Sequence, residues 1–178
     1  VRECVSKGKE AIDWLSDIGT SFTRDKSSNN YHLTQEGGHS KRRVVHSEDA
    51  TGKEVSSSLA EIVRSISNIK VLENHICVDL VTAKGRCVGA YVLDINTNEV
   101  KTFSSGSTII ATGGASKIYL YTSNPDGSSG DGIGLAWRAG CKVENLEFNQ
   151  FHPTCLYHPE AKSFLLSEAL RGEGAFLI

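Results

Sequence analysis

Three stretches of the chain place apolar residues at the three- and four-residue spacing of an amphipathic helix. They cover residues 1–15, 55–66 and 133–139. Gly19 and Gly140 follow the first and third stretches, where a glycine commonly ends a helix. The pattern therefore predicts three helices with two glycine stops.

Polar residues at two positions suit the starts of helices. Asp131 precedes the third stretch and is expected to be its N-cap. Ser167 is expected to cap a short fourth helix that ends at Gly172.

Short runs of β-branched and aromatic residues, separated by turn residues, predict strands. The expected strands are 22–24, 31–35, 69–72, 76–82, 87–94, 99–104, 108–111 and 141–143. Lys84-Gly85 and 96–98 are typical hairpin turns, which makes 76–104 an antiparallel meander.

The run at 108–111 is interpreted as a strand buried on both faces, and it ends directly in Gly113 and Gly114. Ligands of open α/β sheets bind just beyond the carboxyl ends of strands, where glycine lets a ligand approach the backbone. A core strand with a tight turn explains the same residues, so both interpretations stay open.

Composition narrows the classes of partner that the protein can have. The net charge is −2 and 39% of the residues are hydrophobic, which argues against nucleic acid or an anionic membrane as the main partner. No apolar run approaches the roughly 20 residues that a membrane helix needs, and no secretory signal is evident.

The five cysteines are scattered without C-x-x-C spacing, so we expect free thiols, no zinc site and a cytoplasmic location. The sequence begins with Val1, contains no methionine and ends within an apolar run, which favours a piece of a longer protein.

Several polar residues allow a functional and a structural interpretation. The basic residues 41–43 suit either a solvated loop or an anionic ligand. His152 precedes a proline and should be extended; a lone histidine is more often structural than catalytic. Glu168 and Arg171 have the spacing of an ordinary helical ion pair.

Five short motifs nevertheless occur in an order that is specific as a set: 36–40 (EGGHS), 111–114 (ATGG), 129–132 (SGDG), 149–154 (NQFHPT) and 167–174 (SEALRGEG). The set resembles the succinate dehydrogenase/fumarate reductase flavoprotein family. The resemblance implies an α/β fold: residues 1–145 as the central part of a two-dinucleotide-binding FAD domain, with a parallel sheet and the antiparallel meander. Residues 146–178 would begin an α+β capping domain. It also implies non-covalent FAD and no metal.

The resemblance assigns residues one by one. Cofactor contacts would come from Ile76, Cys77, Thr112, Gly113 and Asp131. Substrate contacts would come from Glu36, His152, Leu165 and Ser167, where the family commonly has Thr at the last position. Glu168 and Arg171 match a catalytic proton path. The family's Gly-x-Gly-x-x-Gly loop and catalytic arginine are expected outside this chain.

Glu36 distinguishes activities within the family. A carboxylate there gains a cation partner if the substrate is L-aspartate, but is an unpaired charge beside succinate or fumarate. The resemblance then implies oxidation of L-aspartate to iminosuccinate for NAD biosynthesis, with oxygen or fumarate as electron acceptor and quinolinate synthase as a candidate protein partner. A succinate- or fumarate-converting subunit and a non-catalytic flavin fragment are the alternatives.

Overall fold

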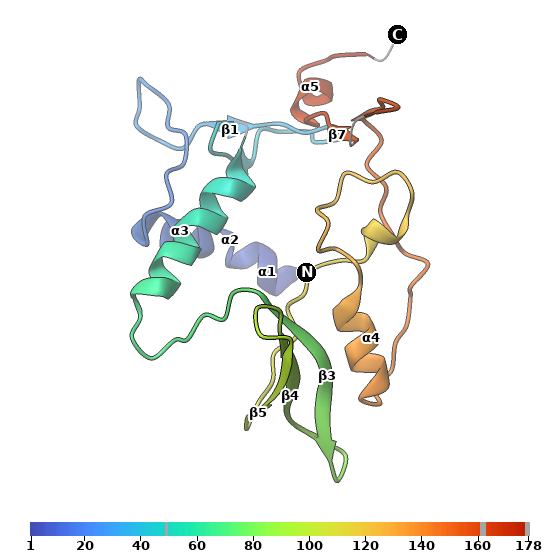
Figure 1. The fold of residues 1–178 in the computed structure, drawn as a ribbon. Helices are drawn as coiled ribbons and strands as arrows, with labels where there is room; N and C mark the ends of the chain where they lie inside the picture. The colour runs from blue at the N-terminus through green and yellow to red at the C-terminus, as the bar shows by residue number, and fades with distance from the viewer. Residues whose placement is uncertain (49, 161–162, 177–178) are drawn as a thin grey trace. The chain divides into compact units, whose positions relative to one another are not determined.

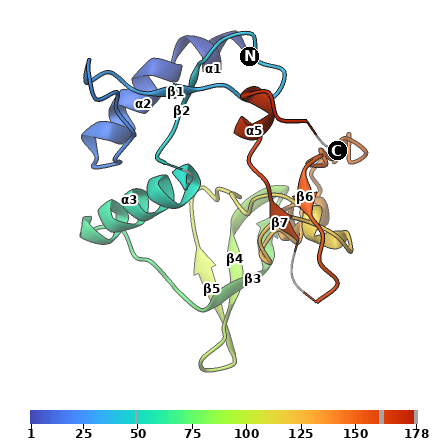
Figure 2. The same cartoon turned by 90° about the horizontal axis from the view of Figure 1, so that it is seen from above.

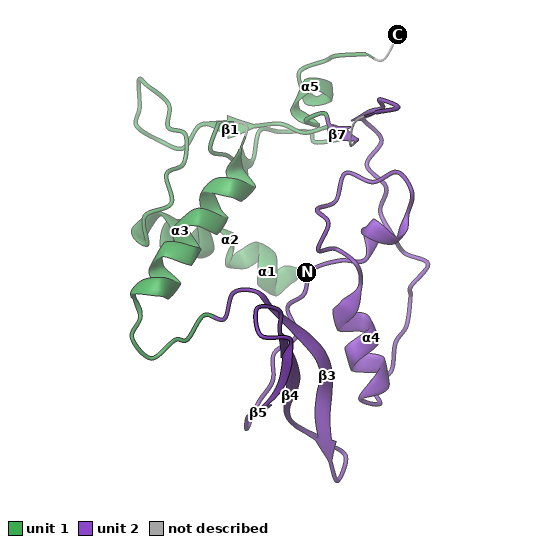
Figure 3. Cartoon of the chain, in the orientation of Figure 1, with its two compact units in different colours: residues 1–71, 166–178 green, residues 72–165 purple. Residues whose placement is uncertain are grey.

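The computed structural model describes residues 1–48, 50–160 and 163–176. The chain forms two compact units, shown in separate colours in Figure 3. Unit 1 combines residues 1–71 and 166–178, and unit 2 is residues 72–165. The predicted division at residue 145 concerns domains of a longer protein and stays a prediction.

Unit 1 is mainly helical. Its elements are α1 (Arg2–Ser6), α2 (Gly8–Asp17), β1 (Leu33–Thr34), β2 (Val44–Val45), α3 (Thr51–Ser65) and α5 (Ala169–Gly172) (Figure 1). The helix expected over 55–66 is therefore confirmed as part of α3.

The first predicted helix is two helices, because it breaks at Lys7 before Gly8, a residue with low helix propensity. Its predicted end is confirmed. Gly19 has φ +103° and donates its N–H to the Ser16 carbonyl at 3.0 Å, while Thr20 N–H reaches the Leu15 carbonyl at 2.9 Å. These two bonds satisfy carbonyls that the helix end would otherwise leave unpaired.

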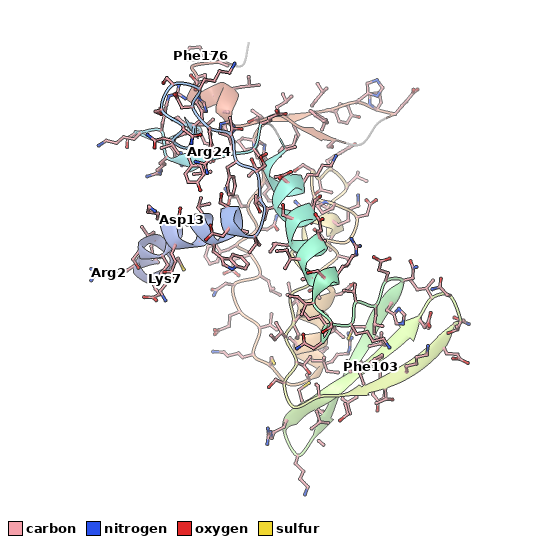
Figure 4. The ribbon with its side chains drawn as sticks, turned by 90° about the vertical axis from the view of Figure 1, so that its left-hand side faces the viewer. Arg2, Lys7, Asp13, Arg24, Phe103 and Phe176 are labelled. Atoms are coloured by element: carbon pink, nitrogen blue, oxygen red, sulfur yellow. The ribbon has the colours of Figure 1, made fainter. Side chains whose placement is uncertain are left out.

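The strands of unit 1 are shorter than predicted. The expected strand 31–35 reduces to β1, which pairs antiparallel with β2, a strand that was not predicted. The expected strand 22–24 contributes only an isolated bridge from Arg24 to Tyr31. Arg24, labelled in Figure 4, lies over the Tyr31 ring at 4.6 Å, so side chains as well as backbone join these segments.

Unit 2 contains the predicted meander. Its elements are β3 (His75–Ala83), β4 (Arg86–Asp94), β5 (Glu99–Ser104), the 3₁₀ helix η1 (Ser116–Ile118), α4 (Asp131–Arg138), β6 (Cys155–Leu156) and β7 (Phe164–Leu165). Strands β3, β4 and β5 lie side by side and antiparallel (Figure 2). The turn between β3 and β4 consists of Lys84 (φ +50°) and Gly85 (φ +73°). A hydrogen bond from Lys101 at 2.8 Å holds the pKa of Asp94, at the end of β4, at about 2.

Helix α4 packs beside β3 (Figure 1). Leu135 is 3% exposed, and Arg138 Nε bonds the Asp79 carboxylate at 3.2 Å. The expected N-cap is wrong: Gly130 occupies that position with φ +81°, and Asp131 is the first helical residue. The adjacent Gly132 N–H bonds the Thr112 hydroxyl instead of a cap side chain.

Three predicted strands, 69–72, 108–111 and 141–143, are not strands. A strand needs a neighbour for its hydrogen-bond ladder, and the described residues place none beside these segments. The supposedly buried Ile109 is 89% exposed. The mixed α/β class is confirmed, with antiparallel pairing throughout the part of the chain that the structure describes. No helix in the described ranges is long and apolar enough to cross a bilayer.

Candidate functional site

One group of predicted site residues comes together in unit 1. The loop between β1 and β2 carries Glu36 and Gly37, and α5 carries Arg171. A Cβ atom at Gly37 would lie 3.4 Å from Arg171 Cζ, so the guanidinium rests directly on this glycine. We call Glu36, Gly37, Glu168 and Arg171 the α5 cluster.

Backbone contact fixes this arrangement. A Cβ atom at Gly172 would overlap the carbonyl oxygen of Gln35, the residue before Glu36. The end of α5 therefore approaches the loop as closely as a glycine permits.

The charges of the α5 cluster are unevenly paired. Arg171 Nη2 forms an ion pair with Glu168 Oε1 at 2.9 Å, which confirms the three-residue helical spacing. Arg171 Nε is buried and has no hydrogen-bond partner in the described ranges. The half-buried Glu36 carboxylate has no ion-pair partner among residues 1–48, 50–160 and 163–176. The cluster thus combines a carboxylate that has no ion-pair partner in the described ranges with an arginine that is paired to Glu168.

Ser167 and Leu165 flank α5 in sequence. The expected cap at Ser167 is wrong by one position, because Glu168 is the N-cap of α5. Ser167 Oγ, one residue earlier, accepts a hydrogen bond from Ala169 N–H at 3.2 Å. Leu165 belongs to β7 in unit 2, pairs with Cys155 and is 46% exposed.

A second group lies in unit 2, where the segment 111–115 meets the start of α4. Thr112 Oγ1 accepts the Gly132 N–H at 3.1 Å, and the Gly130 N–H bonds the Gly114 carbonyl at 3.1 Å. Gly113 has φ +75° and lines an open groove of about 480 Å³. We call Thr112, Gly113 and the exposed Asp131 the α4 cluster.

Ile76 and Cys77 lie on β3, the strand alongside α4. Ile76 is 49% exposed, and burial is the main cause that raises the pKa of the Cys77 thiol above its ordinary value. In the described residues β3 is an edge strand that pairs with β4 alone, so its other edge presents main-chain groups.

His152 lines a pocket of about 190 Å³ within unit 2. Its Nδ1 lies 3.2 Å from the Thr154 nitrogen, so the backbone two residues ahead holds the ring. Ser116 Oγ donates to Asn149 Oδ1 at 2.9 Å, and Tyr119 packs edge to face on Phe151 at 4.9 Å. The sequence patterns did not single out Ser116 or Tyr119. The only signal for them was indirect: their partners Asn149 and Phe151 belong to the stretch 147–154, where aromatic and polar residues alternate.

The α4 cluster fits part of a dinucleotide cofactor. The region above Gly113 is open, since a Cβ there would meet no described atom within 4 Å, and a helix start with an exposed carboxylate adjoins it. An exposed carboxylate accepts hydrogen bonds from ligand hydroxyl groups, and the bare glycine backbone lets a ligand approach closely.

Comparison with known proteins identifies the family of the chain. The model of the FAD binding domain family matches residues 1–178. The chain therefore belongs to the FAD-binding domain family of the succinate dehydrogenase/fumarate reductase flavoproteins.

Within this family, the relatives with similar sequences and the solved structures with similar folds carry different names. The chain is 56% identical to the L-aspartate oxidase of Pseudomonas aeruginosa, over 99% of this chain and 35% of that protein. It is 40% identical to the chloroplastic L-aspartate oxidase of Arabidopsis thaliana, over 99% of this chain and 29% of that protein. The FrdA chain of the Escherichia coli quinol fumarate reductase superposes with a TM-score of 0.89 at 25% identity, covering 96% of this chain and 28% of that chain. The chain thus spans about a third of the length of the curated relatives it matches.

Proposed function

We propose that this chain is part of a flavoenzyme that oxidises L-aspartate at Cα to iminosuccinate with non-covalently bound FAD. Relatives named L-aspartate oxidase, which are 56% and 54% identical, support this activity. The structural observation that carries the proposal is the α5 cluster, which places Glu36, a carboxylate without an ion-pair partner in the described ranges, in one unit with Glu168 and Arg171.

Glu36 selects the substrate in this proposal. Its carboxylate attracts the ammonium group of L-aspartate and repels dicarboxylates that lack an amino group. Gly38 leaves room for a ligand near this carboxylate, because a Cβ at position 38 would meet no described atom within 4 Å, whereas Arg171 lies against Gly37.

The other residues bind and orient the dicarboxylate. His152 donates a hydrogen bond to one substrate carboxylate, while Leu165 and Ser167 line the substrate site. Glu168 and Arg171, already joined at 2.9 Å, carry the proton that the substrate amine releases. FAD, when bound, supplies the acceptor for the hydride, and Ile76, Cys77, Thr112, Gly113 and Asp131 contribute to holding it.

The wider role follows from this chemistry as part of the same proposal. Oxygen or fumarate reoxidises the enzyme, and iminosuccinate serves NAD biosynthesis in the cytoplasm, with quinolinate synthase as the partner that consumes it. The likeness to fumarate reductase structures supports fumarate as an acceptor.

A succinate- or fumarate-converting flavoprotein is the second candidate. The superposition on the Mycobacterium smegmatis Sdh1 structure, with a TM-score of 0.84, supports it at 29% identity. The higher identity to aspartate oxidases and the carboxylate of Glu36 favour the first candidate. The third alternative is a flavin-binding protein without catalytic activity. In that case the full-length protein would turn over neither L-aspartate nor fumarate.

The test replaces Glu36 with Gln in the full-length protein. We expect kcat/KM for L-aspartate to fall at least about tenfold, which corresponds to about 1.4 kcal/mol. Reduction of fumarate by the chemically reduced enzyme should stay unchanged or rise, because a repulsive charge is removed.

Glu61→Gln is the matched control, since it removes an exposed carboxylate of α3 in the same unit. Equal losses on both substrates would assign Glu36 a role in shaping its loop only, and the choice of L-aspartate would lose its main support.

A further inference from the structure

An ion pair connects the substrate-facing loop to the end of α5 across 131 residues of sequence. Arg42 Nη2 lies 2.6 Å from Glu173 Oε1 and 2.8 Å from Glu173 Oε2. Arg42 belongs to the basic stretch 41–43, for which a solvated loop and an anionic ligand were the open interpretations. Its partner in the structure is a carboxylate of the chain itself.

The position of this ion pair is more informative than its strength. Glu173 directly follows Gly172, whose backbone touches Gln35, and Arg171, which rests on Gly37. The loop and α5 therefore meet at three consecutive positions of α5 and its cap. Residue 172 sets how closely they approach, and the half-exposed Arg42–Glu173 ion pair joins the loop to the residue directly after α5.

α5 contains only four residues, so little within the helix itself fixes its orientation. The backbone contact at Gly172 sets the distance between α5 and the loop, and a side-chain contact beyond it can hold the orientation in which Arg171 lies over Gly37. The ion pair is the contact best placed for this, since it pulls the helix end towards the loop that carries Glu36.

We propose that Arg42 is a positioning residue of the substrate site, acting through its ion pair with Glu173. The pair holds α5 against the loop so that Arg171 and Glu168 keep their place relative to Glu36. This inference rests on the proposed function, because it assumes that Glu36, Glu168 and Arg171 act on substrate.

The pair adds little to folding stability, since Arg42 and Glu173 are 49% and 53% exposed and exposed ion pairs contribute little. Its effect on turnover is larger, because a displacement of about 1 Å at a reacting group lowers rates by about 10²-fold. Loss of turnover with unchanged stability is therefore the signature of positioning.

The experiment compares Arg42→Glu, Glu173→Arg and the double exchange in the full-length, FAD-loaded enzyme. Each single change places like charges together, and we expect kcat for L-aspartate to fall about tenfold while FAD content and the melting temperature stay at wild type. The double exchange should recover kcat to within about threefold, and Arg42→Lys, which keeps the charge, should behave as wild type.

Arg43→Glu is the matched control. It makes the same charge change one position away, at an exposed arginine with no ion pair among the described residues. An equal loss in Arg43→Glu, or a double exchange no better than the worse single variant, would overturn the inference. If Arg42→Glu does not fold, Arg42→Gln removes the pair without repulsion and should show about a threefold loss of kcat.

A second readout separates this inference from the proposed function. Amide hydrogen exchange at 169–175 should speed up in Arg42→Glu and return to the wild-type rate in the double exchange, whatever substrate the enzyme uses. If wild type does not oxidise L-aspartate but exchange follows this pattern, the proposed function fails while the contact stands. Faster exchange with unchanged kcat would show that the pair holds α5 without positioning anything, which overturns the inference.

Discussion

The α5 cluster and the α4 cluster solve a similar packing problem in opposite ways. Next to each cluster, a glycine at a helix end lies so close to a distant segment that an added Cβ would overlap it: Gly172 beside the α5 cluster and Gly132 beside the α4 cluster. At Gly172 an added Cβ would overlap a backbone carbonyl, that of Gln35. At Gly132 it would overlap side-chain atoms, Thr112 Oγ1 and Ile110 Cγ2.

This difference separates a contact that is fixed from one that can adjust. A carbonyl oxygen moves only with its peptide unit, whereas a threonine or isoleucine side chain can change rotamer. The α5 cluster is built to keep charged side chains in register, as expected for residues that act on a substrate. The α4 cluster leaves an open groove and an exposed carboxylate, which suits residues that line a cofactor.

The largest effect is expected from Gly172→Ala. The new methyl group has no space against the Gln35 carbonyl, and overpacking of this kind costs about 1–3 kcal/mol. Since α5 must move, kcat/KM for L-aspartate should fall about five- to hundredfold, while FAD affinity stays near wild type. Steady-state kinetics together with flavin titration measure both quantities in the full-length enzyme.

Gly52→Ala serves as the control, because a Cβ there meets nothing within 4 Å in the described part of the chain and the residue lies in α3 of the same unit. A Gly172→Ala enzyme with wild-type kinetics would show that the α5 cluster adjusts as easily as the α4 cluster, and the contrast between them would disappear.

Gly132→Ala should have a smaller effect and a different target. Thr112 can rotate away from the new methyl group, but it then loses the hydrogen bond from the residue 132 amide, worth about 0.5–1.5 kcal/mol. We expect the dissociation constant for FAD to rise about two- to tenfold, with little change in kcat once the enzyme is saturated with FAD. Gly127→Ala, an exposed glycine of unit 2 with open space around it, is the control.

A rise in KM for L-aspartate without any change in FAD affinity would contradict this assignment. It would place the α4 cluster on the substrate side and remove the division of roles between the two clusters.

The meander and the α5 cluster differ in how far the sequence predicts them. Local patterns suffice for the meander of β3, β4 and β5, because alternation and the Lys84-Gly85 turn act between neighbours in sequence. The stop at Gly19 is local in the same way. The α5 cluster depends on residues such as Arg42 and Glu173, 131 positions apart, which no periodicity connects. Only the resemblance to a known family singled out Glu36, Glu168 and Arg171 as one site.

The errors have the same physical origin. Residues 108–111 have the composition of a buried strand, yet a ladder requires a neighbouring strand that their own side chains do not specify. At Asp131 the residue type was right for a cap, but Gly130 takes the position because the turn there requires a positive φ.

The smallest expected effect, and the sharpest test of the α4 cluster, is that of Asp131→Asn. Asp131 is the first helical residue and not the cap, so its stabilisation of α4 comes from a negative charge at the helix start, worth about 0.3–1 kcal/mol. The melting temperature should therefore fall slightly, and this fall should shrink as salt is raised, because salt screens exposed charges. If Asp131 also faces the cofactor, FAD should bind about two- to fivefold more weakly in the variant, and Glu147→Gln, an exposed carboxylate of the same unit, should not share this loss. A variant that melts earlier but binds FAD like wild type would make Asp131 a helix-start charge and nothing more. In that case the open side of the α4 cluster would be reduced to Thr112 and Gly113.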